Sequence, residues 1–328
     1  MASSPGKLTR MNTDWVDAEQ RLSYWEESCR SALVGLRCSS HAVDGLRAEQ
    51  SLLDLDVIRV GKVQGNAHVI ERTPALISAY PTESIFANLL LDDDTFLYQR
   101  GRGFNLHRGD VILYDARMPY LLGCGDHIHQ FHVDVSTACF RERVAKAGLD
   151  RPIHISGSSG AAKVYGAALR NLLARTLAAV PPDISEAGAL QAQVCDLLAS
   201  MVHVSAGRAP HSALGASHVL AAKAYIEDHL GDESMSAADV ALAISVSERH
   251  LRRLFSQQDT SLVEYMLSRR LINAHGELAD PVHAHLGVAE VAYRWGFVSA
   301  AHFSRVFKAR FGLTPSALRA AGAPRTDH

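Results

Sequence analysis

The sequence predicts an α+β protein with an N-terminal β-barrel, helices after it, a linker and a C-terminal all-α domain. Three observations support this prediction: short β-like runs between about residues 48 and 135, helical periodicity from about residue 137, and a repeated helix-turn-helix pattern near the C-terminus. We expect a loosely structured segment over 1–20, an N-terminal domain over 21–204, a linker over 205–217 and the helical domain over 218–322.

Composition and charge set limits on the class of protein. The chain has 328 residues, 47% of them hydrophobic and 21% charged, with a formal net charge of −2. These values are ordinary for a two-domain globular protein and give no overall basic field. The five cysteines are scattered without a CxxC pair, which argues against a disulfide framework or a zinc site. Without a signal peptide or an apolar run of about 18 residues, we expect a cytoplasmic protein with no membrane contact, cofactor or metal.

Short apolar runs predict the strands of the N-terminal barrel, from about residue 48 to 135. The runs lie at 86–91, 95–98 and 111–114, and turn clusters rich in Asp and Gly separate them. Short strands with frequent turns are typical of a small barrel or sandwich.

The barrel is followed by residues with helical texture, over about 137–204. One helix is predicted over Ala162–Ala179, stopped by Pro181-Pro182, and a second over Glu186–Val204. These helices would pack either on the β-domain or on a second copy of the chain. The small, polar residues 205–217 that follow have the composition of an interdomain linker.

A sequence repeat lies near the C-terminus. Residues 238–255 and 289–307 align, with Val240 corresponding to Val291 and Phe255 to Phe307, and one residue is inserted in the second turn. Each copy predicts a helix, a tight turn and a second helix.

The residues that the two copies share fit that motif. A small alanine lets two helices approach, an apolar residue after the turn fills the gap between them, and a serine caps the second helix. These scaffold residues are Ala241, Val246 and Ser247 in the first copy, and Ala292, Gly296, Phe297 and Ser299 in the second.

The remaining face of each second helix indicates function. It carries Arg249, Arg252 and Arg253 in the first copy, and Ala300, Ala301, His302 and Arg305 in the second. Arginine can read guanine in the major groove or hold a phosphate. Residues 293–319 contain no Asp or Glu, so positive charge is concentrated where a DNA-facing surface needs it. Two such units favour sequence-specific binding of double-stranded operator DNA over helical hairpins with solvated arginines.

The segments around the repeat fit the same interpretation. Ser261 and Glu264 have the capping-box spacing that opens a long helix between the copies. A helix of roughly 18 residues spans about 27 Å and would hold two recognition helices about one DNA turn, roughly 34 Å, apart. Thr314 and Pro315 then begin a short closing helix.

With these motifs, residues 218–322 resemble the DNA-binding domain of AraC/XylS-family transcription regulators. The motifs are EVAYRWGF at 290–297, HFSRVFK at 302–308 and FGLTP at 311–315. The resemblance implies seven helices, two of which read adjacent major-groove segments through the exposed residues named above.

The chain departs from the family pattern in one turn and on one recognition face. The family usually has glycine where this chain has Ser245, and a strained non-glycine turn costs about 1 kcal/mol. Ala300 and Ala301 offer only apolar contact to a thymine methyl. We therefore expect the first recognition helix to supply most polar base contacts, and a monomer to recognise an asymmetric site.

The N-terminal half is similar, less specifically, to the cupin-like effector domain of these regulators, through Glu71-Arg72-Thr73 and Arg108-Gly109-Asp110. This resemblance implies a jelly-roll barrel that binds a small-molecule effector, helices that form a homodimer, and an activator that works with RNA polymerase. Such regulators often control catabolism of aromatic or other small organic compounds. Arg72, Tyr98 and Tyr114 are candidate effector contacts, since a buried arginine suits a carboxylate, although each also has an ordinary structural explanation.

Three histidines invite another interpretation. His127 and His129 would share one face of a strand and could hold a metal ion, with His132 nearby. A cupin-type metalloenzyme fused to a DNA-binding module is therefore an alternative, as is an N-terminal domain that docks a protein partner. The glutamate and later histidine of a cupin enzyme do not follow, and the sequence contains no P-loop or dinucleotide-binding pattern. We therefore expect a regulator and not an enzyme.

Overall fold

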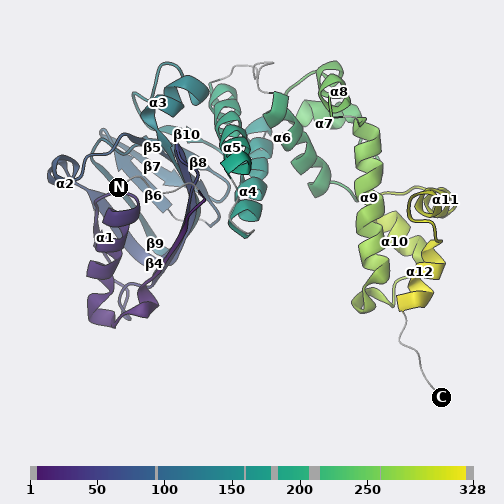
Figure 1. The fold of residues 1–328 in the computed structure, drawn as a ribbon, viewed down its shortest axis with the longest axis horizontal. Helices are drawn as coiled ribbons and strands as arrows, with labels where there is room; N and C mark the ends of the chain where they lie inside the picture. The colour runs from purple at the N-terminus through teal and green to yellow at the C-terminus, as the bar shows by residue number, and fades with distance from the viewer. Residues whose placement is uncertain are drawn as a thin grey trace. The chain divides into compact units, whose positions relative to one another are not determined.

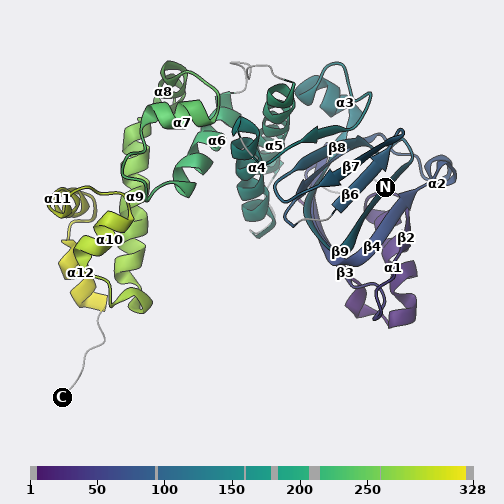
Figure 2. The same ribbon diagram turned by 180° about the vertical axis from the view of Figure 1, so that it is seen from behind.

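The computed structural model describes residues 6–92, 95–158, 160–178, 184–206, 215–258 and 260–322 (Figures 1 and 2). Contacts divide the chain into two compact units, Met1–Ser217 and His218–His328. Each unit has its own hydrophobic core.

The first unit is built on one curved sheet of ten antiparallel strands, ordered β1-β3-β4-β9-β5-β8-β10 with β2, β6 and β7 branching from it. The strands are β1 (Leu8–Asn12), β2 (Arg37–Ser39), β3 (Ala48–Asp54), β4 (Ile58–Arg72), β5 (Ser84–Leu90), β6 (Thr95–Gln99), β7 (Arg102–Leu106), β8 (Val111–Asp115), β9 (Tyr120–Ser136) and β10 (Ile153–Ile155).

Two long strands make the sheet curl around an interior. The first half of β9 pairs with β6, its second half pairs with β5, and β4 pairs with β9 along almost its whole length. The register shifts between Asn66 and His68, a bulge of the kind that bends paired strands. Side chains on the inner face therefore converge on one core, and the predicted β-domain followed by helices is confirmed.

The N-terminal segment differs from the prediction. The sequence predicts a loose segment over 1–20, but Leu8–Asn12 form β1, which pairs residue by residue with β3. Short 3₁₀ turns follow at Thr13–Trp15 and Ala18–Gln20. β1 lies at the edge of the sheet and pairs with one neighbour only. An edge strand can carry polar side chains, because part of it faces solvent. The sequence of β1 therefore lacks the apolar pattern that would predict a strand.

Helix α1 (Arg21–Ala32) packs against the inner face of the curled sheet. Its buried residues Trp25 and Cys29 are four positions apart, so they lie on one side of the helix. They join Tyr114 and Leu122 of the sheet in the same core. The short helix α2 (Pro74–Ala79) is capped at its N-terminus by Thr73, whose side chain accepts a hydrogen bond from the Leu76 N–H.

Helices follow the sheet, as the sequence predicts. They are α3 (Thr137–Cys139), a π-helical turn (Phe140–Val144), α4 (Gly160–Ala178) and α5 (Ile184–Ser205). Figures 1 and 2 show α4 and α5 side by side. The predicted stop at Pro181-Pro182 and residues 207–214 of the predicted linker lie outside the described residues.

The second unit consists of seven α-helices and one 3₁₀ turn (Pro281–His283) within the described residues, matching the number that the resemblance implies. The helices are α6 (Gly215–Asp228), α7 (Ala237–Ala243), α8 (Glu248–Ser256), α9 (Leu262–Ala279), α10 (Val288–Arg294), α11 (Ala300–Phe311) and α12 (Pro315–Gly322).

The two helix-turn-helix pairs, α7–α8 and α10–α11, have the same turn geometry. In the first turn the Val246 N–H donates to the Ala241 carbonyl, and in the second the Phe297 N–H donates to the Ala292 carbonyl, both at 3.0 Å. Ser245 and Gly296 occupy the equivalent left-handed positions, with φ of 58° and 71°. The repeat in the sequence is therefore a repeat in the backbone.

The helix starts confirm the predicted capping residues. The side chains of Ser247 and Ser299 accept hydrogen bonds from the third residue of α8 and α11. Ser261 and Glu264 form a complete capping box on α9, which has the expected 18 residues. Pro315 is the first residue of α12.

The equivalent turn positions give a matched stability prediction. Ser245→Gly should raise the free energy of unfolding by up to about 1 kcal/mol, because it relieves a left-handed non-glycine residue. Gly296→Ala should lower it by more than about 2 kcal/mol, since the added Cβ would lie 2.6 Å from the Leu230 carbonyl oxygen. Chemical denaturation followed by circular dichroism measures both changes. Equal effects of the same sign would contradict the shared turn geometry.

Candidate DNA interface and effector cavity

The exposed face of α8 presents the three predicted arginines. Arg249, Arg252 and Arg253 are exposed, while Leu251, Leu254 and Phe255 on the opposite side are buried. Arg252 forms an ion pair with Glu248, 2.6 Å apart and one turn away on the same helix. An exposed pair of this kind contributes only about 0.3–0.5 kcal/mol, so DNA would release Arg252 at little cost.

The exposed face of α11 presents the second set of predicted residues. Ala301, His302 and Arg305 are exposed and Ala300 is half-buried, while Phe303 and Phe307 are fully buried. Lys308 continues the basic face toward the C-terminal end of the helix, and Arg310 is exposed elsewhere on its last turn. Gly312 terminates the helix in a left-handed conformation.

Two of the basic residues in this region serve the fold. Arg294 lies 3.2 Å from the buried carboxylate of Glu277, which also accepts a hydrogen bond from Trp295 Nε1 at 2.6 Å. Arg319 donates to the His283 carbonyl. The other exposed Arg and Lys side chains of residues 288–322 are Arg305, Lys308 and Arg310, and all three lie on α11.

The geometry suits insertion of two helices into DNA. Each recognition helix is fixed by a buried apolar side and a capped N-terminus, and each exposes basic side chains. Polar base contacts come mainly from arginine, and α8 carries three where α11 carries one among the predicted contacts.

The first unit holds an interior cavity between α1 and the inner face of the sheet. Aromatic walls come from Trp25, Phe86, Tyr114 and Tyr120. Its polar lining comes from Gln50 on β3, His68 on β4, and Gln130 and His132 on β9. These four polar residues are buried, and no sequence motif singles out Gln50 or Gln130.

Arg72 does not have the predicted role as an effector contact. Its side chain is fully buried, and its three nitrogens donate to backbone carbonyls of Ala116, Gly35 and Tyr80. All three guanidinium nitrogens are thereby bonded within the protein, and Arg72 does not line the interior cavity. The guanidinium therefore joins three loops of the fold and is not available to a ligand carboxylate.

The two predicted tyrosines are placed differently from each other. Tyr98 on β6 is 49% exposed and does not line the interior cavity. Tyr114 on β8 does line it, and its hydroxyl accepts a hydrogen bond from Asn88 Nδ2 at 3.3 Å. Of the three candidate effector contacts, Tyr114 alone reaches the cavity.

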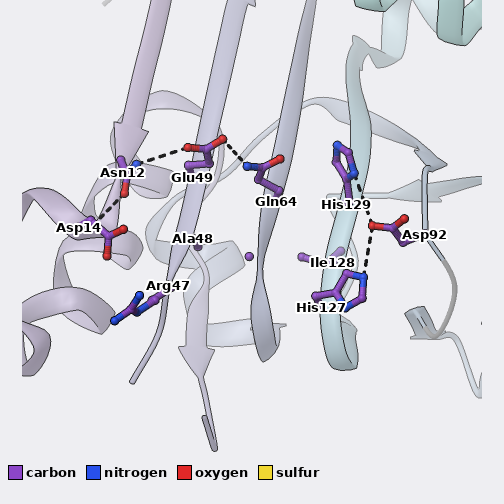
Figure 3. Close-up of a pocket in the computed structure, with 11 residues that line it drawn as sticks. Asn12, Asp14, Arg47, Ala48, Glu49, Gln64, Asp92, His127, Ile128 and His129 are labelled. Carbon is purple, nitrogen blue, oxygen red and sulfur yellow. Dashed lines mark hydrogen bonds and ion pairs between the residues drawn. The ribbon is translucent and has the colours of Figure 1, made fainter. Parts of the chain in front are cut away.

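The three histidines do not form one site. His127 and His129 lie in an open groove, where each ring is 3.4 Å from the same Asp92 oxygen (Figure 3). His132 points to the other face of β9, into the interior cavity. Among the described residues, no group of three or more His, Cys, Asp and Glu side chains is arranged to hold a metal ion.

Family models match both units of the chain. The AraC-binding-like domain matches residues 25–203, and the helix-turn-helix domain matches residues 240–321. The first match alone covers more than half of the 328 residues. The chain belongs to the AraC/XylS family of transcription regulators.

Among the proteins similar to this chain are two relatives and one solved structure. The transcriptional activator NphR of Rhodococcus sp is 26% identical over 269 residues, covering 80% of this chain and 77% of NphR. The transcriptional activator RhrA of Rhizobium meliloti (strain 1021) is 31% identical over 137 residues, covering 40% of this chain and 42% of RhrA. The AraC-like transcriptional activator CuxR has a solved structure that covers 83% of this chain and 96% of its own, at 16% identity and a TM-score of 0.47.

NphR and RhrA are transcription activators, in line with the prediction that this AraC/XylS-family chain is a regulator and not an enzyme. The helix-turn-helix match makes it a DNA-binding protein. Within the described residues, no helix has both the length and the apolar character needed to cross a membrane.

Proposed function

We propose that this AraC/XylS-family regulator is a ligand-responsive transcription activator whose effector is a small organic molecule bound in the interior cavity. The observation that carries the proposal is the cavity itself, enclosed by α1 and the sheet inside the AraC-binding-like domain. Its aromatic walls and few convergent polar groups are typical of small-molecule sites.

The DNA side of the proposal rests on α8 and α11. One protomer would read an asymmetric operator, with Arg249, Arg252 and Arg253 making most of the polar base contacts and Arg305 anchoring the second helix. The protein would act as a homodimer through α4 and α5 and recruit RNA polymerase, and its target would be an operon for metabolism of the effector.

The experiment combines an operator with a ligand screen. The operator is first selected from random double-stranded DNA by the full chain. Small organic molecules are then screened for a rise in the melting temperature of the protein, because a ligand of the native state stabilises it. We expect a stabilising compound to change operator affinity. Stabilising compounds that leave operator affinity and reporter transcription unchanged would contradict ligand control.

A further inference from the structure

Three residues that line the interior cavity each have a buried atom that can accept a hydrogen bond but has no partner among the described residues. These atoms are Gln50 Oε1, Gln130 Oε1 and His132 Nε2. Their side chains are only 3% to 4% exposed. A buried polar atom without a partner is costly, so proteins keep few of them and usually for a reason.

The strand register places these atoms on one floor of the cavity. Gln50 pairs with Val63 of β4, which pairs with Gln130 of β9, so the two glutamines lie in one row across three strands. Adjacent strands are about 4.8 Å apart and successive residues rise about 3.4 Å. Gln50 and Gln130 are therefore about 10 Å apart at the backbone, and His132 lies about 7 Å from Gln130 along β9.

The tautomer of His132 is set by its neighbours. Asn88 Nδ2 donates to the Tyr114 hydroxyl, so Asn88 Oδ1 faces His132 Nδ1 at 2.8 Å and accepts its proton. Nε2 is then the unprotonated nitrogen and accepts from the cavity side. Burial lowers the pKa of His132 to about 3, and the nearby Arg59 contributes, so the ring remains neutral at physiological pH.

No charged side chain is available to an anion in this cavity. Within the described part of the chain, its lining contains no Lys, Arg, Asp or Glu, and Arg72 is committed to backbone carbonyls. A carboxylate would lose its hydration there and find no cationic partner. Burying an unpaired charge is strongly unfavourable, so the cavity selects against organic acids.

The walls favour a flat, apolar body. Phe86 and Tyr114 meet edge to face with ring centroids 5.6 Å apart, and Tyr114 and Tyr120 do so at 5.0 Å. Trp25 of α1 completes this aromatic lining. Aromatic side chains pack well against another ring in such arrangements.

We propose, on the basis of the proposed function, that the effector is an uncharged aromatic compound that carries a hydroxyl or amino group. That group donates a hydrogen bond to Gln50 Oε1, Gln130 Oε1 or His132 Nε2. Gln50 and Gln130 are then specificity-determining residues. The cavity volume of about 40 Å³ holds only a few waters, so a ring enters by displacing lining side chains.

The test uses four one-ring probes on the full chain at neutral pH, measured by calorimetry and thermal shift. 4-Methylphenol and 4-methylaniline are neutral donors, 4-methylanisole has a similar shape without a donor, and 4-methylbenzoate is charged. We expect the two donors to bind at least tenfold more tightly than the ether, and the carboxylate not to bind. An ether or a carboxylate that binds as tightly as the donors, or four probes that all fail to bind, would overturn the donor assignment.

Gln130→Met removes the side-chain amide, and with it the acceptor oxygen, while keeping the side-chain length. Gln64→Met is the matched control. Gln64 is the next residue to Val63 on β4, but its side chain lies on the other face of the sheet and donates to Glu49. We expect Gln130→Met to weaken binding of 4-methylphenol at least fivefold, to leave 4-methylanisole unchanged, and to raise the melting temperature of the ligand-free protein by about 2 °C. Gln64→Met should change neither affinity.

The outcomes separate this inference from the proposed function. A melting temperature that falls in Gln130→Met would mean that Oε1 has a structural partner, and would overturn the inference even if every probe bound. Stabilisation by an anionic compound that also changes operator affinity would overturn the inference and leave ligand control intact. The proposed function fails separately, if no stabilising compound of any class changes operator affinity.

Discussion

Arg72→Met is expected to unfold the N-terminal unit and not simply to abolish a ligand response. The substitution leaves three backbone carbonyls, those of Gly35, Tyr80 and Ala116, without their donors in a buried region. Removing one partner from a buried charged hydrogen-bond network typically costs about 3–5 kcal/mol, which is a large part of the stability of a domain.

Arg72→Lys should also fail, because one ammonium cannot reproduce the planar fork that reaches three acceptors. Arg37→Met is the control, since Arg37 is exposed on the neighbouring strand β2. Calorimetry and circular dichroism of the full chain measure the loss. A folded Arg72→Met protein with the stability of the parent and no ligand response would restore the role of Arg72 as an effector contact.

Operator affinity is expected to fall in both Arg253→Ala and Arg305→Ala. Each arginine is exposed on a recognition helix whose opposite side is buried. The loss should be about 1–3 kcal/mol for an arginine that reads a base, which corresponds to roughly 5–150-fold in the dissociation constant. The loss of operator affinity should be larger for Arg253→Ala than for Arg305→Ala if Arg253 contacts guanine and Arg305 contacts phosphate.

Salt dependence separates those two roles. Removing an arginine that holds a phosphate reduces the slope of log K against log salt by about one, whereas removing an arginine that reads a base relaxes specificity at one position. Arg102→Ala, an exposed arginine on β7 of the other unit, controls for the change in net charge. Unchanged affinity in both recognition-helix variants would refute the two-helix interpretation.

The C-terminal unit could be predicted from its sequence because its signals are local. Caps, turn residues and apolar spacing act within a few residues of one another. The alignment of the two copies therefore located α8 and α11 and their caps at Ser247 and Ser299. The family resemblance indicated the strained turn at Ser245, which is left-handed.

The N-terminal unit could be predicted less completely because its contacts are between distant segments. Arg72 bonds Gly35 and Ala116, and β1 pairs with β3 some forty residues later. No local pattern records such pairings. Arg72 is buried, and the partners that satisfy its charge depend on the loops that the fold brings together.

The cavity residues illustrate the same limit. Gln50 on β3 and Gln130 on β9 are polar residues in antiparallel strands. The polar residues of such a strand usually face solvent. The register of β3, β4 and β9 turns both inward. The sequence could indicate an effector domain, but the acceptor atoms that select the effector could be found only from the pairing of the strands.

We propose that α8 and α11 of one chain read two adjacent segments of the major groove. Missing-base interference on the selected operator tests this most directly, with the full chain and with the Arg253→Ala and Arg305→Ala variants. We predict two segments of interference about one helical turn, roughly 10 base pairs, apart, with Arg253→Ala erasing signals in one segment and Arg305→Ala in the other. A single segment, or two segments that neither variant alters, would contradict recognition by two helices.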